Sequence, residues 1–187
     1  MRRVKYLLAA LILLLVPLRA QCQKVALSTN VMGYLNLGTL NMEASYSLSR
    51  HFTVNAGVKY NPFSFPVGKY GDRMQNRQQT YAVGARYWPW YVYSGWWVAA
   101  KAQYSEYNTG GIVSADTMEG DRVGGGITAG YSYMLNPHFN IEVGAGAWMG
   151  NDRYTQYTCP TCGRIVEKGD RFFILPNDII VSFSYVF

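Results

Sequence analysis

LNMEASYSL-SRH-FTVNAGVKY, residues 40–60, consists of two nine-residue runs joined by three residues. In both runs apolar or aromatic side chains occupy every second position, with polar or small side chains between them. Successive side chains of a β-strand point to opposite faces, so this period of two predicts two strands with one apolar face each. A three-residue connection predicts that they form an antiparallel hairpin.

The same alternation returns along the rest of the chain. Six further segments show it: residues 25–31, 81–87, 96–104, 123–135, 139–147 and 179–187. The total is therefore eight predicted strands. Their typical length of about 9–11 residues is what a tilted strand needs to cross a bilayer.

The connections between these segments alternate in length. Short turns are predicted at 49–51, 89–94 and 135–138, and long loops at 61–79, 107–120 and 150–177, with a shorter loop at 33–39. Outer-membrane barrels have short periplasmic turns and longer external loops. The sequence therefore predicts an all-β protein, an eight-stranded antiparallel up-and-down transmembrane β-barrel with both termini in the periplasm.

The polar face of the strands carries five charges: Glu43, Lys59, Arg86, Lys101 and Glu142. A secreted β-sandwich would show the same alternation with its faces reversed. Two features favour the membrane barrel: glycines crowd the polar face, as a narrow lumen requires, and aromatic residues gather at strand ends, as in interfacial girdles. The aromatic residues are Tyr46, Phe52, Tyr60, Tyr81, Tyr87, Tyr104, Tyr131, Tyr133 and Phe139. An eight-stranded lumen barely holds its side chains, so the five charges are expected to pair and plug it rather than form an ion path.

The first 20 residues are predicted to be a signal peptide. A basic start precedes an apolar run from Tyr6 to Val16, which is too short to span a bilayer as a helix. Cleavage is expected after Ala20, leaving residues 21–187 as the barrel domain. Lipidation of Cys22 is the alternative, although Gln21 fits such a site poorly.

The net charge depends largely on this segment. Four basic residues belong to it: Arg2, Arg3, Lys5 and Arg19. Without them the formal charge falls from +6 to +2. Nucleic-acid binding, which needs a clustered basic surface on the folded domain, is therefore not expected.

Cys159-Pro-Thr-Cys162-Gly163 lies in the last long loop. Such a knuckle supplies half of a zinc site, and no second pair of ligands accompanies it in the sequence. In an oxidising exterior a disulfide between Cys159 and Cys162 is the favoured interpretation. A metal shared between chains, or a free or redox-active pair, remains the alternative.

No catalytic residues or cofactor are expected. Both histidines, His51 and His138, fall in predicted periplasmic turns, far from any external nucleophile. Four carboxylates are expected to be solvated loop residues: Asp116, Glu119, Asp121 and Asp152. The aromatic run 88–93, with Trp96 and Trp97, is interpreted as part of the periplasmic girdle. A lipid-modifying enzyme and a small pore remain the alternative functions.

The C-terminal strand ends on alternating Val181, Phe183, Tyr185 and Phe187. This pattern resembles the signal by which barrel-assembly machinery recognises outer-membrane clients. The chain also resembles a family of small Bacteroidota outer-membrane proteins of unestablished function. The resemblance rests on YNPF at 60–63, ARYW at 85–88, YSEYNTGG at 104–111 and YTCPTCG at 157–163, with Phe63 where the family would have Trp.

The resemblance implies a barrel in contact with outer-membrane lipid and lipopolysaccharide, sometimes encoded beside fimbrial genes. It supplies no catalytic residues. The sequence therefore predicts a non-enzymatic barrel whose external loops serve adhesion, the organisation of a fimbria or other appendage, or envelope integrity. A surface or fimbrial protein is the expected kind of partner.

Overall fold

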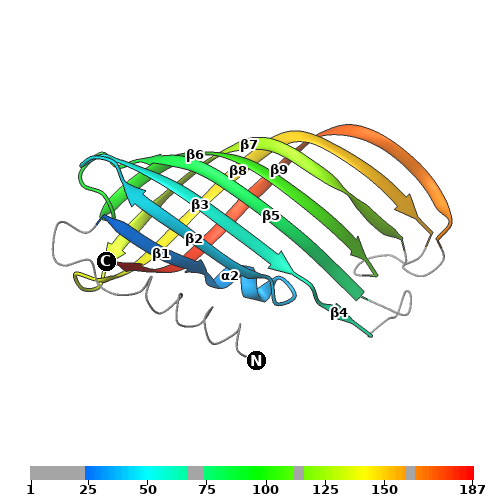
Figure 1. Cartoon of the computed structure of the whole chain (residues 1–187), viewed down its shortest axis with the longest axis horizontal. Coiled ribbons are helices and arrows are strands. Elements are labelled where there is room, and N and C mark those ends of the chain that lie inside the picture. The colour runs from blue at the N-terminus through cyan, green and yellow to red at the C-terminus, as the bar shows by residue number, and fades with distance from the viewer. Residues whose placement is uncertain (1–23, 67–73, 112–115, 159–162) are drawn as a thin grey trace, which may run out of the picture.

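A computed structural model describes residues 24–66, 74–111, 116–158 and 163–187. The chain forms one closed antiparallel β-barrel (Figure 1). The strands of its wall are β1 (Val25–Asn30), β2 (Leu40–Ser47), β3 (Phe52–Asn61), β5 (Met74–Tyr87), β6 (Gly95–Gly110), β7 (Thr117–Met134), β8 (Phe139–Tyr157) and β9 (Ile165–Val186). The helix α2 (Val31–Leu35) follows β1, and the two-residue strand β4 (Ser64–Phe65) pairs with the start of β5.

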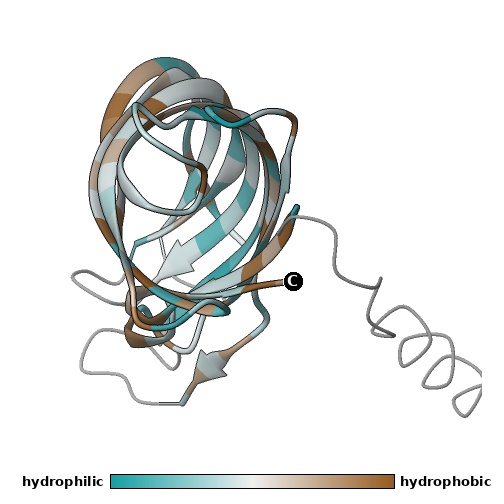
Figure 2. Cartoon of the chain, turned by 90° about the vertical axis from the view of Figure 1, so that its left-hand side faces the viewer, coloured by the Kyte–Doolittle hydropathy of each residue, from teal (hydrophilic) through white to brown (hydrophobic). Residues whose placement is uncertain are grey.

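The ring closes between the first and last strands. β1 pairs with β2 on one edge and with β9 on the other, from Ala26 opposite Val186 to Asn30 opposite Ser182. The Phe187 N–H then donates to the Val25 carbonyl at 2.8 Å. Figure 2 looks into this end of the ring. The predicted eight-stranded antiparallel barrel is confirmed.

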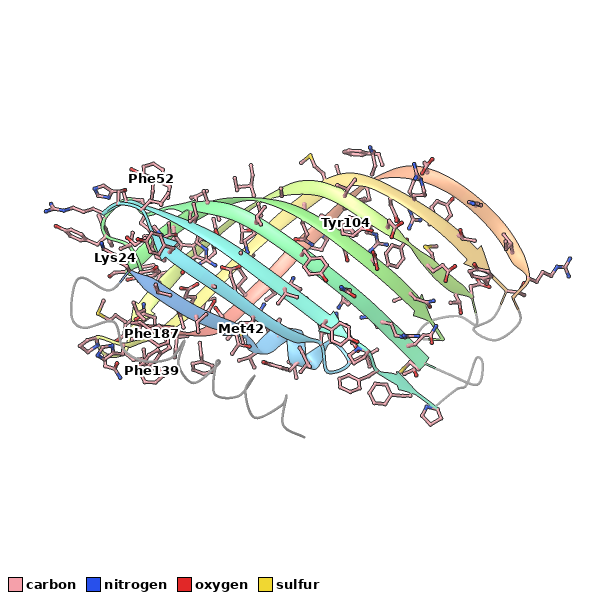
Figure 3. All side chains as sticks on the ribbon, viewed as in Figure 1. Lys24, Met42, Phe52, Tyr104, Phe139 and Phe187 are labelled. Atoms are coloured by element: carbon pink, nitrogen blue, oxygen red, sulfur yellow. The ribbon has the colours of Figure 1, made fainter. Side chains whose placement is uncertain are left out.

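The barrel is apolar on the outside and polar on the inside. Met42, Ile127 and Ile179 are 58%, 65% and 64% exposed, whereas Thr128 and Ser182 are buried. Figure 3 shows Phe52, Phe139 and Phe187 on the outer surface near one end, with Tyr104 farther along. The alternation in sequence therefore corresponds to two real faces, and the polar one lines the lumen.

The strands extend farther at one end of the barrel than the sequence predicts. Their length grows from six residues in β1 to 22 in β9. Most of the predicted loops 107–120 and 150–177 is strand, because β6 runs to Gly110 and β9 begins at Ile165. β5 to β9 therefore continue past β1–β3 as a projecting sheet (Figure 1). We call this the projecting end, and the opposite end, with the short connections 48–51, 88–94 and 135–138, the turn end.

α2 lies at the seam between β1 and β9, and the pairing of β8 with β9 is irregular at two places. Asn30 caps α2 by accepting from the Met32 N–H at 3.1 Å, and its side chain also bonds Val181 N and Ile179 O of β9. The register of β8 and β9 shifts by one residue between the pairs Ala145–Ile179 and Ala147–Pro176. Across the part of the chain that the structure describes, no helix is long and apolar enough to span a membrane.

Candidate functional site

Four of the five predicted lumen charges meet in the middle of the barrel. Arg86 donates from Nη1 to Glu142 at 2.8 Å and from Nη2 to Glu43. Lys101 donates from Nζ to the second oxygen of Glu43 at 2.9 Å. Two cations thus face two carboxylates, and all four side chains are largely buried. The network is neutral and joins β2, β5, β6 and β8 across the lumen.

Small neighbours on the adjacent strands leave room for these side chains. Glu43 lies between Ser28 and Gly57, Arg86 between Thr53 and Ala99, Lys101 between Gly84 and Gly126, and Glu142 between Ser132 and Ser182. A narrow barrel has space for one large side chain per level only if its neighbours are small. This accounts for the glycine-rich polar face.

Lys59, the fifth predicted lumen charge, lies beside this network. It lines a cavity of about 60 Å³ together with Glu43, Arg86 and Lys101. A water needs roughly 10–15 Å³ of such space, so the cavity has room for a few waters among polar partners. The lumen is therefore filled by charged side chains with a small polar gap.

The turn end of the lumen is closed by aromatic side chains. Trp88, Tyr93 and Trp97 are 0%, 3% and 0% exposed, with ring centroids 5.9 Å (Trp88–Tyr93) and 6.3 Å (Trp88–Trp97) apart. The Arg86 guanidinium lies 4.4 Å from the Trp97 ring, so the plug and the charge network touch. The interpretation of this run as girdle was wrong for these three residues; Trp90, Tyr91 and Trp96 do face outward.

The connection 88–94 folds into the barrel because its backbone turns sharply. Tyr93 has a positive φ of 64°, and its carbonyl accepts from Asn140 at 2.7 Å and Ser132 at 3.2 Å. Its hydroxyl donates to the Lys24 carbonyl at 3.1 Å. These bonds offset the cost of the left-handed conformation. Periodicity carries no signal for such a turn.

Both histidines bond backbone carbonyls at the turn end. Nδ1 of His51 lies 3.0 Å from Trp88 O, and Nδ1 of His138 lies 2.9 Å from Val186 O. The C-terminal aromatic residues lie beside them: Tyr185 packs on Phe139 at 4.9 Å and on Phe187 at 4.7 Å. Val181, Phe183, Tyr185 and Phe187 thus belong to the strand that closes the ring.

A second buried cluster lies at the projecting end and was missed by the sequence. Asp152, predicted to be solvated, is 0% exposed. It accepts from Tyr107 at 2.8 Å and from Nε and Nη2 of Arg171 at 2.9 and 2.8 Å, with Arg122 Nε at 3.3 Å. Arg122 also stacks on Tyr107, 3.8 Å from its ring centroid. A direct signal existed for two of these residues, since Arg122 and Asp152 continue the lumen-facing parity of their strands. Arg171 does not, because the register shift between Pro176 and Ile179 reverses the parity of β9.

Burial and the hydrogen bond to Asp152 raise the pKa of Tyr107 to about 12. Tyr107 lies beyond Tyr104, where the predicted membrane segment of β6 ends. The phenol therefore stays protonated, and donates to Asp152, over the whole physiological pH range. The cluster carries two arginines against one carboxylate.

Replacing Asp152 by Asn is expected to reduce the free energy of unfolding by about 1–3 kcal/mol, because it leaves two guanidinium groups without their shared carboxylate. The loss stays in the lower range for buried pairs because Arg171 is 43% exposed. Urea unfolding of the barrel in lipid vesicles measures the loss. The matched control is Asp121→Asn, since Asp121 is exposed on a neighbouring strand. Equal stability of the two variants would contradict this role.

The outer face of the projecting sheet carries a shallow polar pocket of about 590 Å³. Its lining includes charged side chains from β5 to β9: Arg77, Glu106, Glu119, Asp121, Arg153 and Lys168. These residues continue the outward-facing rows of their strands beyond the apolar belt. From β5 to β8 the outer face of the projecting sheet is thus largely polar, whereas β9 also exposes Phe172 and Ile174.

The cysteine predictions lie outside the described residues, as do Cys22 and the predicted signal peptide. Among residues 24–66, 74–111, 116–158 and 163–187, no three His, Cys, Asp or Glu side chains gather as a metal site would require.

The molecule is an all-β protein, a closed eight-stranded antiparallel barrel with a filled lumen, and this architecture is compatible with an outer-membrane protein. The chain belongs to the family described as protein of unknown function DUF3575, whose model matches residues 8–187. Among curated proteins, none is similar enough to this chain to count as a match.

Proposed function

We propose that this chain is a non-enzymatic outer-membrane barrel that holds its projecting sheet above the membrane as a docking surface for a surface or appendage protein. The observation that carries the proposal is the continuation of β5 to β9 past the apolar belt. On β9 the predicted belt covers 179–187, and the strand begins at Ile165. At about 3.3 Å per residue, the additional strand is roughly 45 Å long, more than a turn requires.

The two faces of the wall support the membrane location. Large apolar side chains cover the outside of the barrel between its aromatic ends, an arrangement that water would penalise and lipid would favour. The projecting sheet, in contrast, presents charged rows and a polar pocket. Adhesion, organisation of a fimbria or other appendage, and envelope integrity are the roles that such a platform suits.

Shortening the projecting hairpin tests the proposal. Replacing residues 153–170 by Asn-Gly would join β8 to β9 directly after the Asp152–Arg171 pair through a two-residue hairpin turn. The shortened barrel should still insert and show heat-modifiable migration. A strain carrying it should lose adhesion or surface appendages to the same degree as a strain without the gene. If the strain without the gene were defective but the strain with the shortened barrel were normal, the function would belong to the barrel wall. That result would contradict the proposed docking role of the projecting sheet.

The same strains separate this proposal from the two alternatives. Lipid A mass spectra should be identical with and without the gene, and a mass shift would identify a lipid-modifying enzyme. Planar bilayers should show no single-channel conductance for the parent protein, because Trp88, Tyr93 and Trp97 close one end of the lumen. Steady channels from purified protein would establish a pore.

A further inference from the structure

The projecting part of β9 has one open edge. β8 pairs with β9 from Phe139 opposite Tyr185 up to Tyr157 opposite Ile165. On the other edge, β1 reaches only to Ser182, and Asn30 bonds the next positions, Val181 and Ile179. Farther along, between Ile165 and Pro176, no strand within the described ranges pairs with this edge.

The backbone groups that face this open edge follow from the hydrogen bonds at the seam. Val186 N–H donates toward β8, to His138 O, and Phe187 N–H donates toward β1, to Val25 O. Neighbouring residues of a strand alternate in this way. The register shift at Pro176–Ile179 reverses the parity. The residues whose N–H and C=O face the open edge are therefore Lys168, Asp170, Phe172 and Ile174, whereas Val166 lies in a second register shift, between the pairs Gln156–Glu167 and Tyr157–Ile165.

Several features of this edge are unusual for a strand left in water. Phe172 and Ile174 are 63% and 64% exposed, although both lie beyond the predicted belt on β9. Ile165 and Val166 near its tip are 58% and 60% exposed. Natural sheets protect long edges with short strands, bulges or covering elements. A long edge with exposed apolar residues is suited to pairing with another strand.

The sequence of the edge is complementary to itself. When IVEKGDRFF (165–173) is placed antiparallel to a second copy about Gly169, Lys168 lies opposite Asp170 and Glu167 lies opposite Arg171. Val166 lies opposite Phe172 in the same register. Opposite residues of an antiparallel pair share a face and interact favourably when their charges are opposite. Hydrogen bonding allows this register, because Lys168 and Asp170 both direct their backbone groups to the open edge.

We propose that two copies of this chain associate through antiparallel pairing of residues 165–173 of β9, with the two-fold axis at Gly169. The inference rests on the proposed function in one respect, that this segment stands clear of the membrane. Figure 1 shows the β8–β9 hairpin arching over and bending across the long axis of the barrel at its projecting end. A two-fold axis along the membrane normal reverses the direction of a strand that runs parallel to the membrane, but not of a strand that runs along the normal. The bend therefore allows two barrels in one membrane to present the segment antiparallel.

Charge reversal tests the pairing with its own control. Lys168→Glu and Asp170→Lys should each weaken the dimer about tenfold or more in detergent, because each replaces attractive cross-strand pairs by repulsive ones. Mixing the two single variants should restore dimers, since the introduced carboxylate of one chain then faces the introduced ammonium group of the other, and the unchanged Asp170 faces the unchanged Lys168. The double variant should dimerise like the parent. Analytical ultracentrifugation measures all four samples.

A cross-link fixes the register independently. In a chain with Cys22, Cys159 and Cys162 changed to Ser, Gly169→Cys should form a disulfide-linked dimer, because residue 169 faces its own copy across the axis. The site tolerates a side chain: a Cβ at Gly169 would lie 3.5 Å from the Tyr154 hydroxyl oxygen. Val166→Cys is the matched control and should form no disulfide-linked dimer under oxidation, since Val166 faces Phe172.

Both experiments use barrels first shown to be folded by heat-modifiable migration. A folded parent that stays monomeric at all concentrations would overturn the inference, as would a dimer indifferent to charge reversal. Neither result bears on the proposed docking role. That role is contradicted if the barrel with the shortened hairpin leaves adhesion and surface appendages unchanged.

Discussion

An Arg86→Met variant is expected to lose about 3–5 kcal/mol of unfolding free energy, the largest effect of any charge substitution in the barrel. Arg86 is buried and is the cation shared by Glu43 and Glu142. Its removal leaves Glu142, which is 2% exposed, without its ion-pair partner. A buried carboxylate without a partner is costly, and methionine fills the space without replacing the charge. Urea unfolding in lipid vesicles, followed by the heat-modifiable gel shift, gives the free energy.

The matched control removes all the charges of the network together. With Glu43→Gln, Lys101→Met and Glu142→Gln added to Arg86→Met, no buried charge remains unpaired, so most of the lost stability should return. If the single and quadruple variants were equally unstable, packing rather than charge pairing would explain the effect. If Arg86→Met had the same free energy of unfolding as the parent, the charge network would not stabilise the barrel as proposed.

Trp97→Ala is expected to cost a similar amount, about 3–5 kcal/mol, because it empties the aromatic plug. The Trp97 ring is fully buried and seated over Gly130 and Gly144, where an added Cβ would lie 2.6 and 3.3 Å from it. β7 and β8 carry only glycine at this level, so these two strands cannot fill the space. Urea unfolding in lipid vesicles measures the loss, and no conductance is expected, because the network of Glu43, Arg86, Lys101 and Glu142 still fills the middle of the lumen.

Trp96→Ala is the natural control for Trp97. It changes the adjacent residue of the same strand, but Trp96 is 59% exposed on the outer face and contacts Tyr131 at 5.2 Å. Its loss of stability should be clearly smaller. Equal losses for the two tryptophans would contradict the assignment of Trp97 to the plug.

The parts of the fold that cross the belt were predictable because the two faces of each strand meet different surroundings. Residues 52–60 alternate since lipid lies on one side and a packed lumen on the other, and the same alternation placed Glu43 and Arg86 inside. The projecting strands were not predictable in this way. Residues 151–157 read NDRYTQY, polar at nearly every position, and such a segment resembles a loop in sequence even though it pairs along its length.

The candidate site shows the same division. The lumen positions of the four network charges follow from the alternation of apolar and polar residues in their strands. Asp152 was predicted to lie in a loop because the residues on both faces of β8 are polar around it. The aromatic run 88–93 was assigned to the girdle by composition. Its true place depends on the positive φ of Tyr93 and on bonds from Asn140 and Ser132, which are distant in sequence. Long-range contacts of this kind leave no local pattern.

Because the strands lengthen steadily from β1 to β9, the rim of the barrel at its projecting end rises around the ring and falls abruptly at the seam where β9 meets β1. β7 and β8 pair from Thr117 to Met134, whereas β1 and β9 pair only from Ala26 to Asn30. Because each residue pair adds to the work of separating two strands, the wall is weakest on the two edges of β1, which makes five residue pairs with β9 and four with β2. The barrel wall is therefore expected to open sideways most easily at β1, and the short helix α2, held to β9 by Asn30, strengthens the side of β1 that faces β9.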